Sequence, residues 1–271
     1  MGDSRDTKCP ICGGSDWQTK LNGSGFRIDE CARGCIGRTI PSPAYEDLQA
    51  PSPDESMDGS YQVADLRSGH FKVARELMAL VSKFKDGGRL LDIGSGLGHL
   101  LKLAQDQGYN AVGIDASPAA VRFAGEVFGV QSSVGMFPGC IPAGSSFDIV
   151  IMNHVLEHLP EPGIALQEAT ALLEPGGILA IAAPNYSSLV RVMRGSMWYG
   201  LQPSQHIWQM PVRSIVELIR TAGLTPVATR CNNLEYPRGP RSFVKWARLK
   251  TVLTVAEILQ MGDNAAVLAR K

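Results

Sequence analysis

Short apolar runs alternate with helix-periodic segments through most of the chain between residues 61 and 230. We expect strands over 89–93, 110–115, 131–135, 147–153, 178–183, 224–229 and 264–269, and helices over 98–106, 118–128, 163–173 and 212–222. Strand–helix alternation of this kind predicts an α/β fold, with a doubly wound, mainly parallel sheet and helices on both faces. In such sheets ligands bind beyond the carboxyl ends of the strands, so motifs at those ends are the candidate functional residues.

The most informative of these motifs is a glycine-rich turn in LLDIGSGLGHLL, residues 90–101. Gly94, Gly96 and Gly98 allow a sharp turn and a close approach of the backbone to a ligand. Asp115 ends the next expected strand, where a carboxylate can accept hydrogen bonds from ribose hydroxyls. Asp92 adds a second carboxylate just before the turn, so the pattern indicates a cofactor that contains adenosine.

The spacing of the turn argues against a dinucleotide cofactor. The dinucleotide fingerprint G-x-G-x-x-G/A requires Gly or Ala at position 99, and this chain has His99 there. A packing turn without a ligand is the structural alternative.

Four segments in order resemble the motifs of class I S-adenosylmethionine-dependent methyltransferases, which are Rossmann-like. The segments are LLDIGSGLG, VGIDAS (112–117), FDIVIMNHVLEHLPEP (147–162) and LLEPGGILAIAAPN (172–185). The resemblance implies S-adenosylmethionine as cofactor, with Asp115 at the ribose and Asn153 and His154 at its methionine end. The full set of implied cofactor contacts is Tyr61, Asp92, Gly94, Ser95, Gly96, Gly98, Asp115, Ala116, Met136, Phe137, Asn153 and His154.

One position departs from that family. An acidic residue often follows the third strand and holds the adenine amino group, but here the position falls near Met136. A backbone carbonyl would have to replace it. We also expect the linker and residues 61–71 to form a lid that excludes water from the cofactor.

Two pairs of cysteines near the start predict a metal site. Cys9-x2-Cys12 and Cys31-x3-Cys35 lie 18 residues apart, with glycines at 13, 14 and 34 to form tight turns. Four thiolates suit tetrahedral Zn²⁺ and leave no open position, so the site would be structural. Free thiols and an iron centre with the same ligands remain alternatives.

The composition divides the chain into three regions. Residues 1–40 form the expected zinc-ribbon-like module, and residues 41–60, with four prolines, form a linker or strap. Residues 61–271 form the expected methyltransferase domain, with an acceptor-side insertion over about 186–211 and an apolar tail helix over about 241–260.

The acceptor-side insertion is similar to that of a bacterial subgroup that methylates small molecules. By this resemblance Trp198, Tyr199 and His206 line the acceptor pocket. A histidine titrates near neutrality, so His206, or His154 beside the cofactor, could take a proton from an acceptor hydroxyl. Gln205 stands where the subgroup commonly has Arg, and a purely packing role for His206 is the alternative.

The charge balance argues against a nucleic-acid partner. The chain has 26 Lys and Arg against 26 Asp and Glu, and residues 1–40 carry six basic and five acidic side chains. No uninterrupted apolar stretch reaches the length of about 18 residues that predicts a membrane span, and no secretory signal opens the sequence. We therefore expect a cytoplasmic protein. The tail helix would pack on its own domain, with a homodimer contact or a membrane surface as alternatives.

These patterns together predict a zinc-containing methyltransferase that acts on a small metabolite, with O-methylation favoured. A sugar C-methyltransferase, an N- or S-methyltransferase, a ribosomal RNA base methyltransferase and a non-enzymatic zinc-knuckle protein with an inert cofactor pocket are the alternatives.

Overall fold

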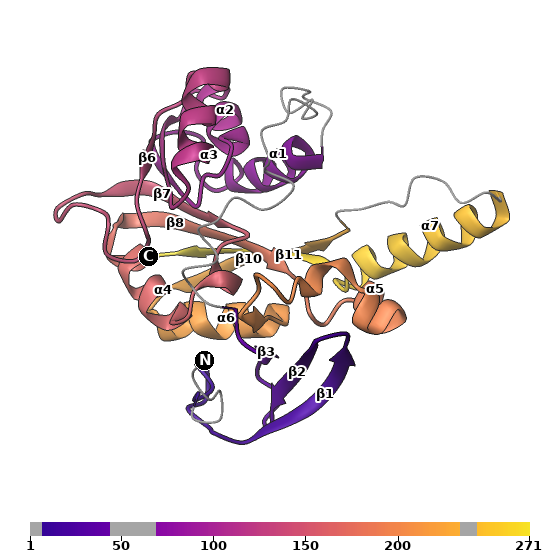
Figure 1. Cartoon of the computed structure of the whole chain (residues 1–271). Helices are drawn as coiled ribbons and strands as arrows, with labels where there is room; N and C mark the ends of the chain where they lie inside the picture. The colour runs from indigo at the N-terminus through magenta and orange to yellow at the C-terminus, as the bar shows by residue number, and fades with distance from the viewer. Residues whose placement is uncertain (1–6, 44–68, 234–242) are drawn as a thin grey trace.

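The computed structural model describes residues 7–43, 69–233 and 243–271. These residues form two sheets, a seven-stranded sheet with the order β10-β11-β8-β7-β4-β5-β6 and a four-stranded sheet with the order β1-β2-β3-β9 (Figure 1). The seven-stranded sheet contains β4 (Arg89–Ile93), β5 (Asn110–Asp115), β6 (Ser132–Val134), β7 (Phe147–Asn153), β8 (Leu173–Pro184), β10 (Thr225–Asn232) and β11 (Asn264–Arg270). The four-stranded sheet contains β1 (Trp17–Gly23), β2 (Phe26–Cys31), β3 (Gly37–Ile40) and β9 (Trp208–Gln209).

Helices cover both faces of the seven-stranded sheet. The helices are α1 (Gly69–Val81), α2 (His99–Asp106), α3 (Pro118–Phe123), α4 (Pro162–Ala171), α5 (Leu189–Arg194), α6 (Val212–Thr221) and α7 (Phe243–Ile258). Short helical turns are the π-helical η4 (Ala124–Phe128) and the 3-10 turns η5 (Leu156–His158), η6 (Gly195–Met197) and η7 (Tyr199–Leu201). Helices α1 and α2 share one apolar cluster with the sheet, and α4 and α6 share another on the opposite face. The predicted doubly wound fold with helices on both faces is confirmed.

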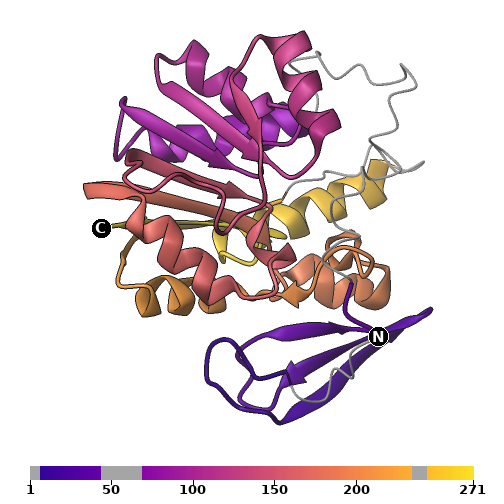
Figure 2. The same ribbon diagram turned by 60° about the vertical axis from the view of Figure 1, so that its left-hand side comes forward.

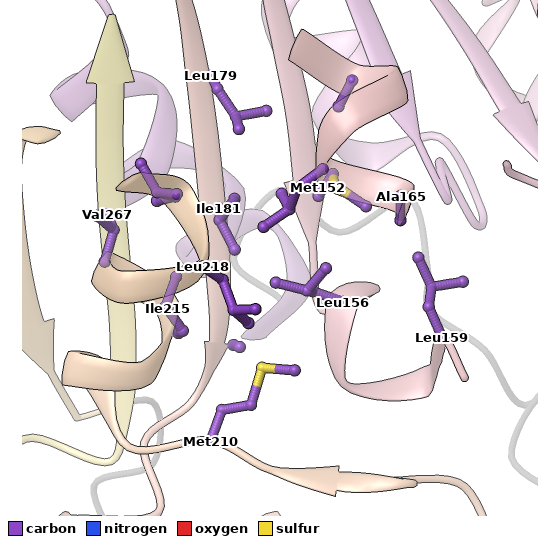
Figure 3. Close-up of a cluster of buried hydrophobic side chains, with 14 of the residues drawn as sticks. Met152, Leu156, Leu159, Ala165, Leu179, Ile181, Met210, Ile215, Leu218 and Val267 are labelled. Atoms are coloured by element: carbon purple, nitrogen blue, oxygen red, sulfur yellow. The ribbon is translucent and has the colours of Figure 1, made fainter. Parts of the chain in front are cut away.

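The cluster beneath α4 and α6 explains why these helices pack where they do. Figure 3 shows Met152, Leu156, Ile181 and Leu218 pointing toward one another between the sheet and α6. Each of these side chains is at most 2% exposed. Burying a side chain of this size contributes roughly 1.5–3 kcal/mol, so this face anchors the loops that follow β7 and β8.

The sheet is mainly parallel, with one reversal. The pairs β4–β5, β4–β7, β5–β6 and β7–β8 are parallel, whereas β11 runs antiparallel to both β8 and β10. The last predicted strand, over 264–269, is confirmed as β11. It lies inside the sheet, between two strands that precede it in the sequence.

The predicted boundary between helix 163–173 and strand 178–183 is wrong. Helix α4 ends at Ala171, and β8 begins at Leu173 and includes residues 174–177. The backbone of Gly177 accepts a hydrogen bond from Lys271 N at 3.1 Å, and Gly176 N donates to Lys271 O at 3.2 Å. These bonds tie the Pro-Gly-Gly stretch to the residue after β11, and Gly176, with a φ of 76°, forms an irregularity within the strand instead of ending it.

The four-stranded sheet lies below the main sheet on the α6 side (Figure 2). Strands β1, β2 and β3 lie in the region expected to form the zinc-ribbon-like module. Strand β3 pairs with β9 through Gly37 opposite Gln209 and Arg38 opposite Trp208. The N-terminal sheet is thus completed by a strand from the acceptor-side insertion.

Two expected features fall wholly or partly on undescribed residues. Most of the linker and the larger part of the expected lid, residues 44–68, lie outside the described residues, as does Tyr61.

In the tail helix, Leu253 and Ala256 are buried while Ile258 and Leu259 are mostly exposed. The suggested dimer and membrane contacts stay predictions. Among the described residues, no helix combines the length and the apolar character needed to cross a bilayer.

Candidate functional site

The glycine loop, residues 94–98, connects β4 to α2 at the carboxyl end of the sheet. The N–H groups of Gly94 and Ser95 both donate to Ile114 O, at 2.8 and 2.9 Å, and tie the loop to the neighbouring strand β5. Gly94 has a φ of 71°, and a Cβ atom there would lie 2.4 Å from Cγ2 of Val155. Only glycine therefore fits between the loop and the turn after β7.

Asp115, the last residue of β5, closes the other side of the loop. Its Oδ2 accepts a hydrogen bond from Gly96 N at 2.8 Å, and its Oδ1 accepts one from Ser117 N at 2.8 Å. The two bonds fix the carboxylate at the loop, and each oxygen keeps a second lone pair for a ligand hydroxyl. Ser95 Oγ lies 2.8 Å from Ser132 Oγ, which connects the loop to β6.

Two polar groups at this edge are buried without a hydrogen-bond partner among the described residues. They are Asp92 Oδ1 on β4 and Asn153 Oδ1 on β7, the strand beside it. Burial, with a contribution from the charge of Asp115, raises the pKa of Asp92 well above its usual value. Because buried polar groups are nearly always paired, these two oxygens mark positions that a polar ligand would satisfy.

The remaining predicted cofactor residues lie at the same edge. Gly98, with a φ of 86°, precedes α2, and a Cβ atom there would lie 2.8 Å from the Cβ of Ala124. Ala116 follows β5, while Met136 (37% exposed) and Phe137 (buried) follow β6. All the described members of the predicted set therefore gather at the ends of the adjacent strands β7, β4, β5 and β6.

His154 directly follows β7 in an unusual backbone conformation. Its φ is 57°, in the left-handed region that non-glycine residues seldom occupy, and its N–H donates to Ala182 O at 2.8 Å. The imidazole is partly exposed, and its Nδ1 lies 3.4 Å from Oε1 of Glu157. Backbone strain of this kind is concentrated at functional sites.

Glu157, in the η5 turn after β7, is a buried carboxylate. It is 1% exposed, and neither carboxylate oxygen has a hydrogen-bond partner among the described residues. Burial by itself would raise the pKa of Glu157, but His154, His158 and His206 outweigh it and lower the pKa to about 2. The carboxylate is therefore ionised at neutral pH.

His206 lies on the far side of Glu157 and is 3% exposed. Its Nδ1 is 3.0 Å from Gly200 O, and its Nε2 is 4.0 Å from Oε1 of Glu157. Burial lowers the pKa of His206 to about 4. The geometry encloses the ring, so the more exposed His154 is better placed to exchange a proton with an acceptor, and the acceptor role of His206 stays a prediction.

The predicted aromatic wall of the acceptor pocket packs against the cysteine module. Trp198 is 2% exposed and forms an apolar cluster with Ile28 of β2 and with Tyr186 and Leu201. The Tyr199 ring lies 6.0 Å from the Trp198 ring, measured between centroids. Trp198 thus packs between β2 and other residues of the acceptor-side insertion, and the pocket role of both aromatic residues stays a prediction.

The four predicted metal ligands come together. Cys9, Cys12, Cys31 and Cys35, hereafter the cysteine cluster, can place one sulfur each within 4.8 Å of all the others, and Cys12 Sγ lies 3.5 Å from Cys31 Sγ. A tetrahedral zinc with bonds of about 2.3 Å holds its sulfurs about 3.8 Å apart, so the spacing fits that ion. The backbone N–H of Gly14 lowers the pKa of Cys12 to about 7, while burial raises the pKa of Cys9 to about 12.

The cysteine module, residues 7–43, is joined closely to the main domain. Cys9 and Cys31 belong to the same buried cluster as Leu218 of α6. Thr39 Oγ1 donates to His206 O at 2.7 Å, and the Arg213 guanidinium donates to Gly34 O at 2.5 Å. The module therefore packs against the segment that carries the predicted acceptor residues.

Comparison with known proteins agrees with this geometry. Residues 67–229 match the family model described as a methyltransferase domain. The chain is 31% identical over 154 residues to the ubiquinone biosynthesis O-methyltransferase of Cereibacter sphaeroides, an alignment that covers 52% of this chain and 62% of the relative. The chain thus spans less than two thirds of the length of that curated relative.

Two solved structures share the fold. The SAM dependent methyltransferase from Archaeoglobus fulgidus has a TM-score of 0.54 at 21% identity, covering 75% of this chain and 95% of that one. The 1,6-didemethyltoxoflavin-N1-methyltransferase of Burkholderia thailandensis, solved with bound 1,6-didemethyltoxoflavin and S-adenosylhomocysteine, has a TM-score of 0.56 at 17% identity. The match covers 94% of this chain and 99% of that one.

Proposed function

The chain belongs to the class I S-adenosylmethionine-dependent methyltransferases, and on this premise we propose that it methylates a hydroxyl oxygen of a small molecule. The arrangement at the carboxyl ends of β4, β5 and β7 is the observation that carries the proposal. It combines a glycine loop in which Gly94 has no room for a side chain with the carboxylate of Asp115, held by a hydrogen bond from the loop. It also contains two buried oxygens, on Asp92 and Asn153, that have no hydrogen-bond partner among the described residues. When bound, S-adenosylmethionine supplies an electrophilic methyl group on its sulfonium.

The residues around the glycine loop would hold that cofactor. Asp115 is placed to accept hydrogen bonds from ribose hydroxyls, and the loop to bring its backbone close to the amino-acid part. Asp92 and Asn153 would face its polar methionine end, where a cationic group would restore the ionised form of Asp92.

His154 would act as the general base. Its Nδ1 faces the ionised Glu157, which leaves Nε2 as the nitrogen that can accept the proton of an acceptor hydroxyl. Removal of this proton makes the oxygen a better nucleophile as the new O–C bond forms and the C–S bond of the cofactor breaks. Methyl transfer also depends on alignment of the two reactants, which the surrounding loops would provide.

An oxygen acceptor is favoured by the name shared by curated relatives, O-methyltransferases of ubiquinone biosynthesis. We therefore propose an acceptor that carries a phenolic hydroxyl. The chain has 26 basic and 26 acidic side chains, and this balance does not favour the RNA alternative.

We further propose that the cysteine cluster holds a structural Zn²⁺. Four converging sulfurs complete its coordination and leave no position for substrate, so the ion would stabilise the module and take no part in methyl transfer.

Calorimetry and product analysis test the proposal together. Purified protein should bind S-adenosylhomocysteine, and mass spectrometry should detect a methylated phenol after incubation with S-adenosylmethionine and a panel of phenols and catechols. His154→Asn should lower kcat by about 10²–10⁴-fold with a much smaller effect on cofactor affinity. If amines are methylated and phenols are not, the acceptor atom is nitrogen and the O-methylation proposal is wrong. Absence of cofactor binding would overturn the whole proposal.

A further inference from the structure

We propose that Glu157, His158 and His206 form a second metal site, separate from the cysteine cluster, which takes a divalent transition-metal ion such as Zn²⁺. Each of the three side chains can offer one ligand atom, and these atoms all lie within 4.8 Å of one another. Two ligands come from η5, after β7, and the third comes from the acceptor-side insertion 48 to 49 residues later. The inference goes beyond methyl transfer and does not depend on it.

The hydrogen bonds of the two histidines point to ligation. Nδ1 of His206 lies 3.0 Å from Gly200 O, and Nδ1 of His158 lies 3.0 Å from Gln205 O. A carbonyl oxygen only accepts, so Nδ1 of each ring must carry a proton, and a neutral ring then has its lone pair on Nε2. Metal-binding histidines nearly always donate their other ring N–H to a carboxylate, a backbone carbonyl or a water, which fixes the tautomer and leaves one nitrogen to bind the ion.

Glu157 supplies the second and independent observation. Its side chain is 1% exposed, and both of its oxygens lack a hydrogen-bond partner among the described residues. Its Oε1 lies 4.0 Å from Nε2 of His206, so a carboxylate faces an imidazole lone pair when the ring is neutral. Two electron-rich atoms at this distance repel each other. A cation between them would be coordinated by both atoms, and this attraction would replace the repulsion.

The donor set selects the type of ion. Two imidazoles and one carboxylate are ligands of zinc, and they also suit cobalt, iron and nickel better than they suit magnesium or calcium. Zinc bonds of about 2.0–2.2 Å in a tetrahedral site place ligand atoms about 3.3–3.5 Å apart, so the three side chains need to close only slightly. Nδ1 of His154 also lies 3.4 Å from Oε1 of Glu157.

The position of the site suggests what the ion would do. It would join the η5 turn, which follows His154, to the loop whose His206 carbonyl accepts a hydrogen bond from Thr39 of the cysteine module. The ion would thus fix the acceptor-side insertion against the end of β7, and it would compensate the buried charge of Glu157.

Metal stoichiometry of the full chain is the first test. After removal of loose metal and incubation with Zn²⁺, inductively coupled plasma mass spectrometry should find two equivalents per chain. The double variant Cys9→Ser/Cys12→Ser should keep one equivalent, and Glu157→Gln and His206→Gln should each keep only the cysteine-bound one. Glu161→Gln, an exposed carboxylate four residues from Glu157, is the matched control and should keep two.

Cobalt substitution tests the same site in the wild-type chain, where folding of a variant is not a concern. Co²⁺ at the cysteine cluster gives intense thiolate charge-transfer bands, whereas Co²⁺ bound by Glu157, His158 and His206 should add weaker visible bands and paramagnetically shifted histidine ring signals. One equivalent of metal, thiolate bands alone and no shifted histidine signals would overturn the proposal. Neither measurement requires an acceptor or cofactor, so the result is independent of methyl transfer.

Discussion

The cysteine module and the seven-stranded sheet are both built from β-strands, but different forces hold them together. Strand β8 is buried from Ile178 to Pro184 and β11 from Asn264 to Ala269, so each contributes a continuous apolar layer to the main core. In β1, by contrast, four of seven residues are exposed and none is fully buried. The main sheet therefore buries a large apolar surface, whereas the module buries fewer side chains, which lie mainly in β2, β3 and the segment that joins them.

The size of the module explains this difference. A segment of about 40 residues seldom buries enough surface to fold without a metal, disulfides or a partner. The module has two such supports, its cysteine cluster and its docking through β3 and β9. Variants that remove one support at a time test whether the module depends on that support while the main sheet does not.

Loss of the cysteine site should have the largest effect. Cys9→Ser should release the ion and unfold residues 7–43, because structural zinc contributes on the order of 10 kcal/mol to modules of this kind. Metal analysis would show one equivalent fewer, and hydrogen exchange would show loss of protection in β1–β3 with β4 and β7 protected. Cys140→Ser, a lone thiol outside the cluster, is the control. Retention of all bound zinc and of the module's protection by Cys9→Ser would contradict the assignment.

A change in the main sheet should instead affect ligand binding and leave the module folded. Asp115→Ala removes the carboxylate that faces the expected ribose, so affinity for S-adenosylhomocysteine should fall by about 1–3 kcal/mol, or roughly 5- to 150-fold. Calorimetry measures the loss, and Asp106→Ala, on the exposed surface of α2, should bind normally. Equal affinities for Asp115→Ala and wild type would remove the ribose role.

Asp92→Asn should raise the stability of the folded chain and lower its affinity for the cofactor. Burial raises the pKa of Asp92 in the folded chain, whereas its unfolded value is about 3.9. Ionisation therefore favours the unfolded state, and stability falls as pH rises from about 4 toward the folded pKa. Asn carries no charge, so the variant should be more stable than wild type, and the gain should be larger at pH 8 than at pH 5.

Urea midpoints at the two pH values measure this gain. Cofactor affinity should fall in the same variant, because Asn cannot offer a negative charge to a cationic ligand. A variant that is less stable than wild type at pH 8 would show that the Asp92 charge is already compensated in the folded chain.

The smallest effect should come from the junction between the two regions. Arg213→Ala removes an exposed donor to Gly34 O and should cost at most about 0.5–1 kcal/mol. Faster exchange of the amides of residues 34–37 would detect it, with Arg220→Ala, exposed on the same helix, as the control. A loss as large as that in Cys9→Ser would mean that docking, and not the metal, holds the module together.

The two regions also differ in how far the sequence predicts them. The strands β4, β5 and β7, the glycine loop and the cysteine pairs are marked by contiguous residues, because each depends on contacts between near neighbours. The pairing of β3 with β9 joins segments about 170 residues apart, and neither four-residue β3 nor two-residue β9 carries a pattern of its own. Nothing local marks Glu157 as a buried charge, since only the fold brings His206 beside it.

The place of β11 has a consequence for synthesis of the chain. This strand follows every other strand in the sequence yet occupies an interior position, hydrogen-bonded to β8 on one side and β10 on the other. Until residues 264–270 leave the ribosome, β8 and β10 are exposed edges with an unfilled gap between them, and unpaired edges favour pairing with other chains. The sheet therefore closes only after translation of this segment, so slow release or truncation at this point should favour aggregation over partial folding.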